Sequence, residues 1–543
     1  MVMEQGYNRL KKQRYAIISL FFIIALGAFL RTYNFHDWLR FNADQARDAS
    51  VARTMVEKND IPLLGPVAGG TEFRIGPISI YFQFLGAWLF GATPDRMAYA
   101  DLLFGILSVP LIFLFFREYF SRNIALSSAA LYAVSFFAIQ YSRFAWNSNS
   151  SQFFVLLLLY AIIKIADKND SKKLVWAVIS GIALGVAIQL HTLLLFGVPL
   201  FFIIIAVHLV KNKRVNILHV AFIIAIAIVI NLPQIINEIN TEQGNTTAFY
   251  DALNKKTPKQ ATMGGNILHV VTCQAQANVR ILLPQAGQES CGFPFTKDNL
   301  KKIDKKKTTF VFWVAYIVPF IFAVLFSIAG YYFMVYRAFK AKEERKRIFF
   351  AVIFAYCISL LLVSFPFGRE ISLRYFILTA FIPYLFMALF LEWLTRKHKM
   401  KKLILALLVV GLVFLYNIYF CVQTFRGYAN NRPGNMIDGN MLQAQKMAEY
   451  LMAQAHPASS FQIGGKKTEL GRFVGRISYF AEGKEMSVIE IEDRKYIDTE
   501  LPLFVAVNEM SKKCEEGSSY KDYGIIEKCK RFNDVTILKM TQN

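Results

Sequence analysis

The chain alternates long apolar segments with short polar connections along most of its length. A helix needs about 20 apolar residues to cross the hydrocarbon core of a bilayer. Eleven apolar segments approach this length, near residues 15–32, 97–116, 124–141, 151–166, 174–190, 193–210, 215–233, 309–336, 348–365, 375–394 and 403–421. The pattern therefore predicts an α-helical polytopic membrane protein with about 11 transmembrane helices.

Basic clusters occupy every second connection between these segments. They include RLKKQR before the first segment, KNKR at 211–214, RAFKAKEERKR at 337–347 and RKHKMKK at 396–402. Lysine and arginine concentrate in the cytoplasmic loops of membrane proteins. The clusters therefore predict a cytoplasmic N-terminus for an integral protein of the cell (plasma) membrane.

The aromatic segment GPISIYFQFLGAWLFG at 76–91 is also apolar enough to cross a membrane. If it crossed, every later basic cluster would lie outside, against the positive-inside rule. We therefore expect an interfacial helix here, on the outer face of the membrane. The loops at 33–96 and 234–308, and the chain after 421, are then extracytoplasmic.

The C-terminal region changes character and predicts a separate fold. NMLQAQKMAEYLMAQA has helical spacing, and short β-like runs follow, such as FQIGG, MSVIEI and PLFVAV. The end, YGIIEKCKRFNDVTILKM, has the pattern of a hairpin with a turn near RFND. We therefore expect a transmembrane domain at 1–425 and a small extracytoplasmic α/β domain at 430–543.

Composition changes this picture little. Of 543 residues, 55% are hydrophobic and 18% charged, and the formal net charge of +23 would suggest nucleic acid as a partner in a soluble chain. Here the basic residues flank apolar segments, so the expected partner is the lipid bilayer and no nucleic acid.

The positions of the cysteines agree with the predicted topology. Cys273 shares one outside loop with Cys291, and Cys514 shares the outside tail with Cys529; each pair is a plausible disulfide on the oxidising side, with free thiols as the alternative.

Polar residues that carry chemistry gather at the predicted outer surface. The stretch FNADQARD places Asp44, Arg47 and Asp48 in the first outside loop, and Arg74 follows. Later connections add Arg143, Trp146, Asn147, His191 and Arg374 at the same side. A guanidinium matches a phosphate, and a carboxylate can take a proton from a hydroxyl. An anionic lipid headgroup and a proton acceptor are thus the expected chemistry.

Five motifs follow one another along the chain: ADQARDA in the first loop, RIGPISIYFQFLGAWLFG, RMAYADLLFGILSVPLIFLFFREYF, QYSRFAWNSN and LRYFILTAFIP. Their order resembles the GT-C membrane glycosyltransferases, on the branch of the dolichyl-phosphate-mannose protein mannosyltransferases and the lipid A aminoarabinose transferases. The resemblance covers roughly residues 15–235 and 366–390.

This resemblance implies transfer of a monosaccharide from a polyprenyl-phosphate carrier to a hydroxyl of a glycan, glycolipid or protein on the outer face. A single displacement would invert the anomeric centre, with one carboxylate as general base, and Asp44 matches it. The implied donor-phosphate residues are Arg74, Arg143 and Arg374, and the implied sugar or acceptor contacts are Tyr81, Trp146, Asn147 and His191. No cofactor is required, although a divalent metal at the loop acids is possible.

Two supporting acids depart from the family pattern. Gln45 stands where relatives often have Glu, which leaves Asp48 as the other nearby acid. On a helix Asp48 shares a face with Asp44, so it could hold an arginine, orient the base or help to bind a metal. Asp101 lies within a span, where a carboxylate suggests function, although it could instead pair with Arg96.

Structural roles compete with each functional one. Asp44 could cap a helix or pair with Arg47, Arg143 could snorkel to the interface, and His191 could be an ordinary interfacial histidine. The aromatic residues could be interface anchors. At the level of the protein, the alternatives are a flippase for a lipid-linked sugar and a transferase of whole oligosaccharides, whose WWDYG motif is missing. The sugar, hexose or pentose, the acceptor and the oligomeric state are not determined by the sequence.

Overall fold

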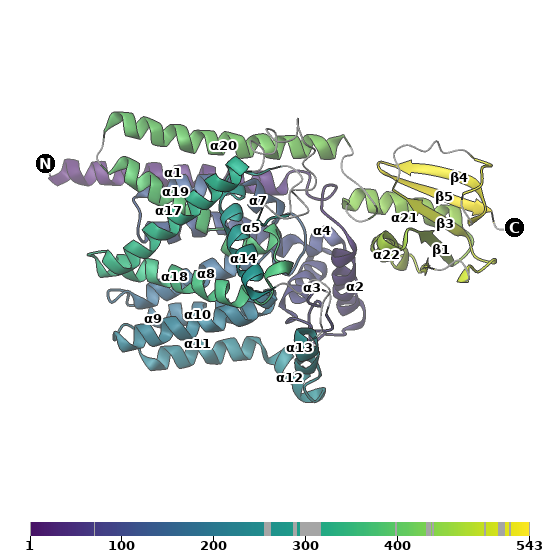
Figure 1. Cartoon of the computed structure of the whole chain (residues 1–543), viewed down its shortest axis with the longest axis horizontal. Helices are drawn as coiled ribbons and strands as arrows, with labels where there is room; N and C mark the ends of the chain where they lie inside the picture. The colour runs from purple at the N-terminus through teal and green to yellow at the C-terminus, as the bar shows by residue number, and fades with distance from the viewer. Residues whose placement is uncertain are drawn as a thin grey trace.

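The computed structural model describes residues 2–69, 71–254, 262–285, 290–293, 317–396, 399–430, 436, 439–492, 496–508, 516–520 and 523–541. A large bundle of helices is followed by a small α/β domain, as Figure 1 shows. The predicted fold class is confirmed in its main features: the chain is mostly helical, and its strands form one C-terminal sheet.

Among the described residues, seven helices are long and apolar enough to cross a membrane, counting α1 from Gln13. They are α1 (Val2–Thr32), α5 (Tyr99–Arg117), α9 (Lys173–Leu190), α10 (Thr192–Lys211), α17 (Val318–Lys340), α18 (Glu344–Ser364) and α20 (Met400–Ala429). Two bent pairs raise the number to nine if each is one span. These are α11 (Ile217–Ile230) with α12 (Leu232–Asn240), bent by 59°, and η3 (Leu373–Thr379) with α19 (Ile382–Thr395), bent by 61°.

The remaining two predicted spans are shorter helices. The segment at 124–141 breaks at Ser135 into α6 (Arg122–Val134) and α7 (Phe136–Gln140). The segment at 151–166 is α8 (Ser151–Ala166), in which nearly every residue is buried. Every predicted apolar segment is thus helical where the structure describes it, and the number of crossings stays a prediction. The beginning of the 309–336 segment lies outside the described residues.

The outer helices of the bundle carry large apolar side chains on their surface. Phe21 and Phe22 of α1 are each 65% exposed, and Leu412 of α20 is 67% exposed. Contiguous exposed surfaces of this kind are rare on soluble monomers. Their burial in lipid is the physical reason for such a surface.

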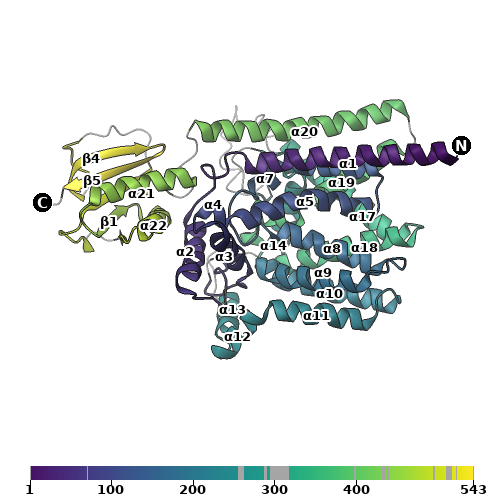
Figure 2. The ribbon, with the colours of Figure 1, turned by 180° about the vertical axis from the view of Figure 1, so that it is seen from behind.

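Connecting elements gather at one end of the bundle. The first loop forms α2 (Ala43–Lys58), α3 (Ile78–Phe90) and α4 (Pro94–Met97), and the 234–308 region contains α13 (Gly244–Asn254) and α14 (Met263–Arg280). The segment expected to be an interfacial helix is indeed helical, as α3. In Figures 1 and 2 the helices α2 and α3 lie beside the C-terminal domain, whereas the chain begins at the opposite end. This arrangement agrees with an odd number of crossings.

The C-terminal domain contains a five-stranded sheet with strand order β2-β1-β3-β5-β4. Its elements are α21 (Met441–Ala455), β1 (Ser460–Gly465), α22 (Lys467–Glu482), β2 (Ser487–Ile491), β3 (Leu503–Val507), β4 (Ile525–Phe532) and β5 (Val535–Thr541). The strands β1, β2 and β3 pair in parallel, while β3–β5 and β5–β4 are antiparallel. The hairpin β4–β5 turns at Asn533, as RFND predicts, and α21 and α22 close over a core that includes Leu451, Phe473 and Phe504.

This domain rests directly on α2. The Phe41 ring contacts the rings of Tyr479 and Phe480 of α22, with centroids 5.6 and 5.5 Å apart. Arg53 of α2 donates to the Tyr479 carbonyl at 2.9 Å and to the Glu482 carboxylate at 2.9 Å. The helix that carries the predicted catalytic acid is therefore held between the bundle and the C-terminal domain.

Candidate functional site

The predicted base lies in the first turn of α2. Asn42 is the N-cap of this helix, and its side chain accepts the backbone N–H of Asp44 at 3.2 Å. Gln45 completes a capping box, because its side chain accepts the N–H of Asn42 at 3.3 Å. Asp44 is thus not the cap, and its side chain is 62% exposed. Negative charge is favoured at this position because the first backbone N–H groups of a helix point toward it.

Arg47 lies between two carboxylates of different exposure. It contacts Asp48 at 2.8 and 2.9 Å and Asp44 at 3.3 Å. Asp48 is buried, and this burial raises its pKa to about 6, although Arg47 opposes the shift. Arg74 also acts on Asp48 electrostatically. Arg47 therefore neutralises the buried acid while Asp44 stays accessible.

Arg74 is carried by a short hairpin that leads into α3. Val67 pairs with Arg74 in an antiparallel bridge, and the guanidinium of Arg74 reaches the Gly65 carbonyl at 3.4 Å. The side chain of Asn245 in α13 pairs with the Arg74 backbone, donating to its carbonyl at 3.0 Å and accepting its N–H at 2.9 Å. The exposed guanidinium is thus held near the acids of α2.

A second cluster gathers Trp146, His191, Arg374 and Tyr375. The Arg374 guanidinium lies 5.9 Å from the Trp146 ring and 5.6 Å from the Tyr375 ring. His191 packs edge-on against Tyr375, and its Nδ1 accepts the Leu193 N–H at 3.0 Å to cap α10. Burial, followed by the charge of Arg374, lowers the pKa of His191 to about 4. The imidazole is therefore neutral, with its proton on Nε2.

Gln189 connects the first loop to this second cluster. Its side chain accepts the Ile78 N–H at 3.1 Å and donates to the Ile230 carbonyl at 2.9 Å, so it ties α3 to the ends of α9 and α11. Asn147 donates to the Leu190 carbonyl at 2.7 Å, beside His191. The connections that carry Arg74, Trp146 and His191 are thereby fixed to one another.

Three predicted site residues are engaged in structural contacts. Arg143 is buried and donates to the carbonyls of Leu30, Arg31 and Asn34 at the end of α1, and burial lowers its pKa to about 10. The Asp101 carboxylate accepts the Trp146 N–H at 3.1 Å and the Ser150 hydroxyl, and not Arg96. The Tyr81 hydroxyl donates to the Pro62 carbonyl at 2.8 Å. Arg74 and Arg374 are therefore the better placed candidates for a phosphate.

An apolar pocket adjoins Tyr375. It lies between α10, α14, α17, α18 and η3, and its space of about 440 Å³ includes the open solvent in front of it. Its walls include Leu193, Tyr331, Leu360 and Phe376, with Gln274 and Thr379 as polar members. The pocket thus provides apolar walls next to the arginine of the second cluster.

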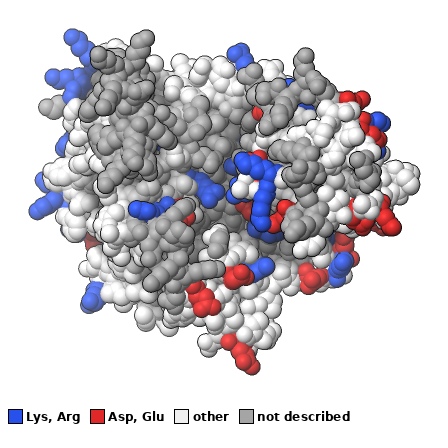
Figure 3. Space-filling view, turned by 45° about the vertical axis from the view of Figure 1, so that its right-hand side comes forward, with Lys and Arg blue, Asp and Glu red and all other residues white. Residues whose placement is uncertain are grey.

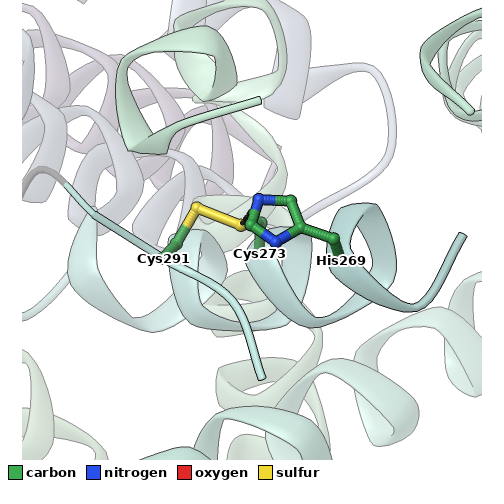
Figure 4. Close-up of side chains that lie close together, drawn as sticks. All are labelled: His269, Cys273 and Cys291. Carbon is green, nitrogen blue, oxygen red and sulfur yellow. Dashed lines mark hydrogen bonds between the residues drawn. A yellow bond between two sulfur atoms is a disulfide. The ribbon is translucent and has the colours of Figure 1, made fainter. Parts of the chain in front are cut away.

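The two predicted cysteine pairs differ in what can be described. Cys273 and Cys291 form a disulfide, and His269 lies beside it with Nε2 3.3 Å from the Cys273 sulfur (Figure 4). Both sulfurs are bonded to each other, so this cluster does not offer thiolates to a metal. Cys514 lies outside the described residues, whereas Cys529 is disulfide-bonded.

The possible divalent metal at the loop acids finds a poor donor set. Asp44 and Asp48 would have to share an ion, but the Arg47 guanidinium already lies between their carboxylates. A fixed positive charge there repels a cation. Across the described parts of the chain, the cluster of His269 with the two bonded cysteines is the one group of three or more metal-ligating side chains within reach of one ion.

Figure 3 views the molecule from the side of the C-terminal domain. Basic side chains gather around a hollow in this face, with acidic side chains beside them. Positive charge around a hollow attracts anions.

Sequence reasoning missed the contacts of two residues of this region. Asn245 begins the glycosylation sequon Asn-Thr-Thr at 245–247, but the sequence does not indicate its contact with Arg74, because that backbone lies 171 positions away. Arg53 is one of the polar residues of the first outside loop, but the sequence did not indicate its partners, since they lie in α22. The contact of Arg47 with Asp44, in contrast, is indicated by their i,i+3 spacing.

The comparisons with known proteins agree with this architecture. A family model described as dolichyl-phosphate-mannose-protein mannosyltransferase matches residues 75–236. ArnT from Cupriavidus metallidurans in the apo state is similar with a TM-score of 0.52 at 12% identity, over 97% of this chain and 98% of that chain. The same protein bound to undecaprenyl phosphate gives a TM-score of 0.50 with the same identity and coverage. No curated protein sequence matches the chain significantly.

An oligosaccharyltransferase from Archaeoglobus fulgidus in the apo form is also similar, with a TM-score of 0.51 at 13% identity over 92% of this chain. The chain spans 70% of that protein, and 65% of the protein in another structure of the archaeal enzyme. These likenesses confirm the resemblance to the GT-C membrane glycosyltransferases at the level of the fold. ArnT matches this fold along nearly its whole length.

Proposed function

We propose that the chain is a membrane glycosyltransferase that moves a monosaccharide from a polyprenyl-phosphate carrier to an acceptor hydroxyl on the outer face of the membrane. The proposal rests on the charged side chains at the end of the bundle where Asp44 lies. There an exposed carboxylate, held by Arg47, lies on the same side as the two exposed arginines Arg74 and Arg374.

The similar proteins support a lipid phosphate as the donor carrier. One ArnT structure contains undecaprenyl phosphate, and the matching family model is named for a dolichyl-phosphate sugar. Both carriers are polyprenyl phosphates. ArnT is the better guide than the archaeal oligosaccharyltransferase, because the similarity includes 98% of ArnT.

Asp44 acts as the general base in this proposal. The acceptor hydroxyl attacks the anomeric carbon, its proton passes to the Asp44 carboxylate, and the polyprenyl phosphate leaves. One displacement inverts the anomeric centre. The stronger contacts of Arg47 are with Asp48, at 2.8 and 2.9 Å, so Asp44 is held by only one longer contact of 3.3 Å and can turn toward an acceptor.

Arg74 and Arg374 stabilise the charge that develops on the departing phosphate. Guanidinium groups match phosphate oxygens in geometry and are always charged. The apolar side chains around this pocket beside Tyr375 then lie next to the start of the carrier's hydrocarbon chain, because the walls are mostly hydrocarbon. Trp146 and the neutral His191 lie beside Arg374, where they can contact the sugar.

The test uses the full-length protein in lipid vesicles with a panel of synthetic polyprenyl-phosphate monosaccharides. We expect transfer with at least one donor, with inverted anomeric configuration in the product. Asp44→Asn should lower the rate by about 10²–10⁴-fold, the usual contribution of a general base. Asp60→Asn is the matched control, because Asp60 is exposed just beyond the other end of α2. An Asp44→Asn protein that keeps the full rate would exclude this residue as the base.

A further inference from the structure

The hairpin that carries Arg74 has one paired and one open edge. Its internal bonds run from the Gly65 N–H to the Ile75 carbonyl at 2.8 Å and from the Ala68 N–H to the Phe73 carbonyl at 2.8 Å. In an antiparallel pair, neighbouring residues direct their backbone groups to opposite sides. The N–H and carbonyl of Arg74 therefore point away from the hairpin, where another group can pair with them.

Asn245 provides that partner with a single side chain. Its amide accepts the Arg74 N–H and donates to the Arg74 carbonyl, as the next strand of a sheet would. Phe249, one turn further along α13, packs against Phe73 with centroids 5.2 Å apart. The helix α13 thus holds both residues that precede Ile75 in the hairpin.

The helix α12, which leads into α13, exposes its apolar face and directs its polar face toward the protein. Its apolar residues Leu232, Ile235, Ile236 and Ile239 follow the i, i+3, i+4, i+7 spacing of one face, and all are exposed, Ile239 by 73%. On the polar face, Glu238 accepts the backbone N–H and the hydroxyl of Thr246 in α13. A helix that turns its polar face to the protein and its apolar face outward is arranged for an apolar surrounding.

The direction of α12 identifies that surrounding. It continues from α11, whose outward residues Ile228 and Val229 are 50% and 62% exposed. The chain bends by 59° between the two helices, so α12 leaves the direction of the apolar helix before it. An amphipathic helix that departs from the end of a lipid-facing helix lies along the membrane surface.

We propose that α12 lies in the outer interface of the bilayer and that α13, through Asn245, holds the Arg74 hairpin at the level of the lipid phosphates. The partner of α12 is the bilayer itself. Asn245 is a positioning residue, because it acts on the Arg74 backbone and not on a ligand. This role of Asn245 rests on the proposed function, whereas the position of α12 in lipid does not.

The position of α12 is tested with a fluorophore on single cysteines in vesicles that contain nitroxide lipids of different depth. Ile239→Cys is the test site, Leu412→Cys of α20 the deep control and Lys484→Cys of the C-terminal domain the aqueous control, all with Cys357 and Cys421 changed to Ser. We expect shallow nitroxides to quench the label at 239 most, deep nitroxides to quench the label at 412, and none to quench the label at 484. A label at 239 that behaves like the one at 484 would overturn the proposal.

The contact between Asn245 and the Arg74 backbone is tested by hydrogen exchange of the full-length protein. In Asn245→Ala the amide of Arg74 loses its acceptor, and its exchange should accelerate about tenfold, as expected for one hydrogen bond. Thr247→Ala is the matched control, because it removes the same Asn-Thr-Thr sequon but leaves Asn245 in place. Equal exchange of the Arg74 segment in both variants would show that Asn245 does not hold the Arg74 backbone.

Binding of undecaprenyl phosphate separates positioning from catalysis. Asn245→Ala should weaken the affinity for this lipid or raise KM for the donor several-fold, with kcat within about twofold, whereas Asn237→Ala of α12 should change neither. If the lipid does not bind the unaltered protein, the proposed function fails while the quenching and exchange results still decide the placement of α12 and Asn245. A fall in kcat without a change in affinity would refute the positioning role.

Discussion

Arg47 determines how the two acids of α2 differ. It forms its shortest contacts with the buried Asp48 and only one longer contact with the exposed Asp44. A buried carboxylate without a cation would be costly to ionise. One arginine therefore supports a structural acid and leaves the neighbouring acid available for chemistry.

The raised pKa of Asp48 predicts a dependence of stability on pH. Because the folded chain binds this proton more tightly than the unfolded chain, with a pKa of about 6 against an ordinary 3.8, the free energy of unfolding should fall as the pH rises from about 4 to about 6. The effect is at most about 3 kcal/mol. Thermal unfolding of the detergent-solubilised protein across this range should show a weaker slope in Asp48→Asn than in the unaltered chain. An identical slope in both proteins would mean that Asp48 does not titrate in this range.

At the scale of elements, the hairpin before α3 depends on a close approach of two backbones. A Cβ atom on Gly65 would lie 2.1 Å from the Gly76 carbonyl oxygen, which belongs to backbone and cannot turn aside. A Cβ on Gly69, in the same hairpin, would meet nothing within 4 Å. The two glycines are thus a matched pair of which only one is constrained by packing.

We expect Gly65→Ala to destabilise the protein by about 1–3 kcal/mol, as overpacking usually does, and to displace Arg74. Gly69→Ala should leave stability unchanged within about 0.5 kcal/mol. Thermal unfolding of the two variants, followed by donor binding, measures both effects. Equal losses would contradict a packing constraint that acts on Gly65 alone.

At the scale of the whole molecule, the C-terminal domain supports α2 from the side away from the bundle. Arg53 is the residue of α2 with the most polar contacts to this domain that are described: its guanidinium lies 4.4 Å from the centre of the Tyr479 ring and donates to the Tyr479 carbonyl and to Glu482. Its carboxylate partner Glu482 is 53% exposed, so that ion pair is screened by water. The ring and the carbonyl therefore contribute more to this interface than the salt bridge.

This ranking predicts that Arg53→Ala loosens α2 more than Glu482→Ala does. Removing the exposed partner should cost about 0.2–1 kcal/mol, whereas removing the arginine also abolishes the cation–π contact and a hydrogen bond. Hydrogen exchange of the amides of α2 and α22 measures the difference, with Arg472→Ala, an exposed arginine of α22, as the control. Equal exchange in the Arg53 and Glu482 variants would contradict the larger contribution of the ring and the carbonyl.

Much of the architecture could be predicted because it depends on local pattern. The predicted apolar segments are helices wherever they are described, and the tail forms the predicted helix and hairpin. The prediction that α3 does not cross the membrane follows from the alternation of basic clusters between the apolar segments, which is also a property of the sequence alone. The length of single crossings was less predictable. The segment at 124–141 breaks at Ser135, and α8 has only 16 residues and is mostly buried by its neighbours; a hydropathy pattern shows neither feature.

The candidate site could be predicted only in part. Asp44, Asp48 and Arg47 are neighbours in sequence, so their spacing on a helix already indicates contact. Arg143 was grouped with the phosphate-binding residues from its position at a span end, but its guanidinium is engaged by carbonyls of α1 more than 100 residues away. A sequence gives the side of the membrane on which a cation lies, but not which backbone groups reach it first.

The sequence by itself determined that this chain has helices apolar enough to cross a membrane and which acid begins α2, because hydropathy and helix periodicity act over short stretches of chain. The side of the membrane on which its polar residues lie stays a prediction. Only the tertiary structure decided which arginines stay available and what holds them. Asn245 on Arg74, Gln189 on Ile78 and Arg53 on Tyr479 join residues far apart in sequence. Such contacts exist only once the helices have packed, because hydrogen bonds require distances near 3 Å that no single segment can set.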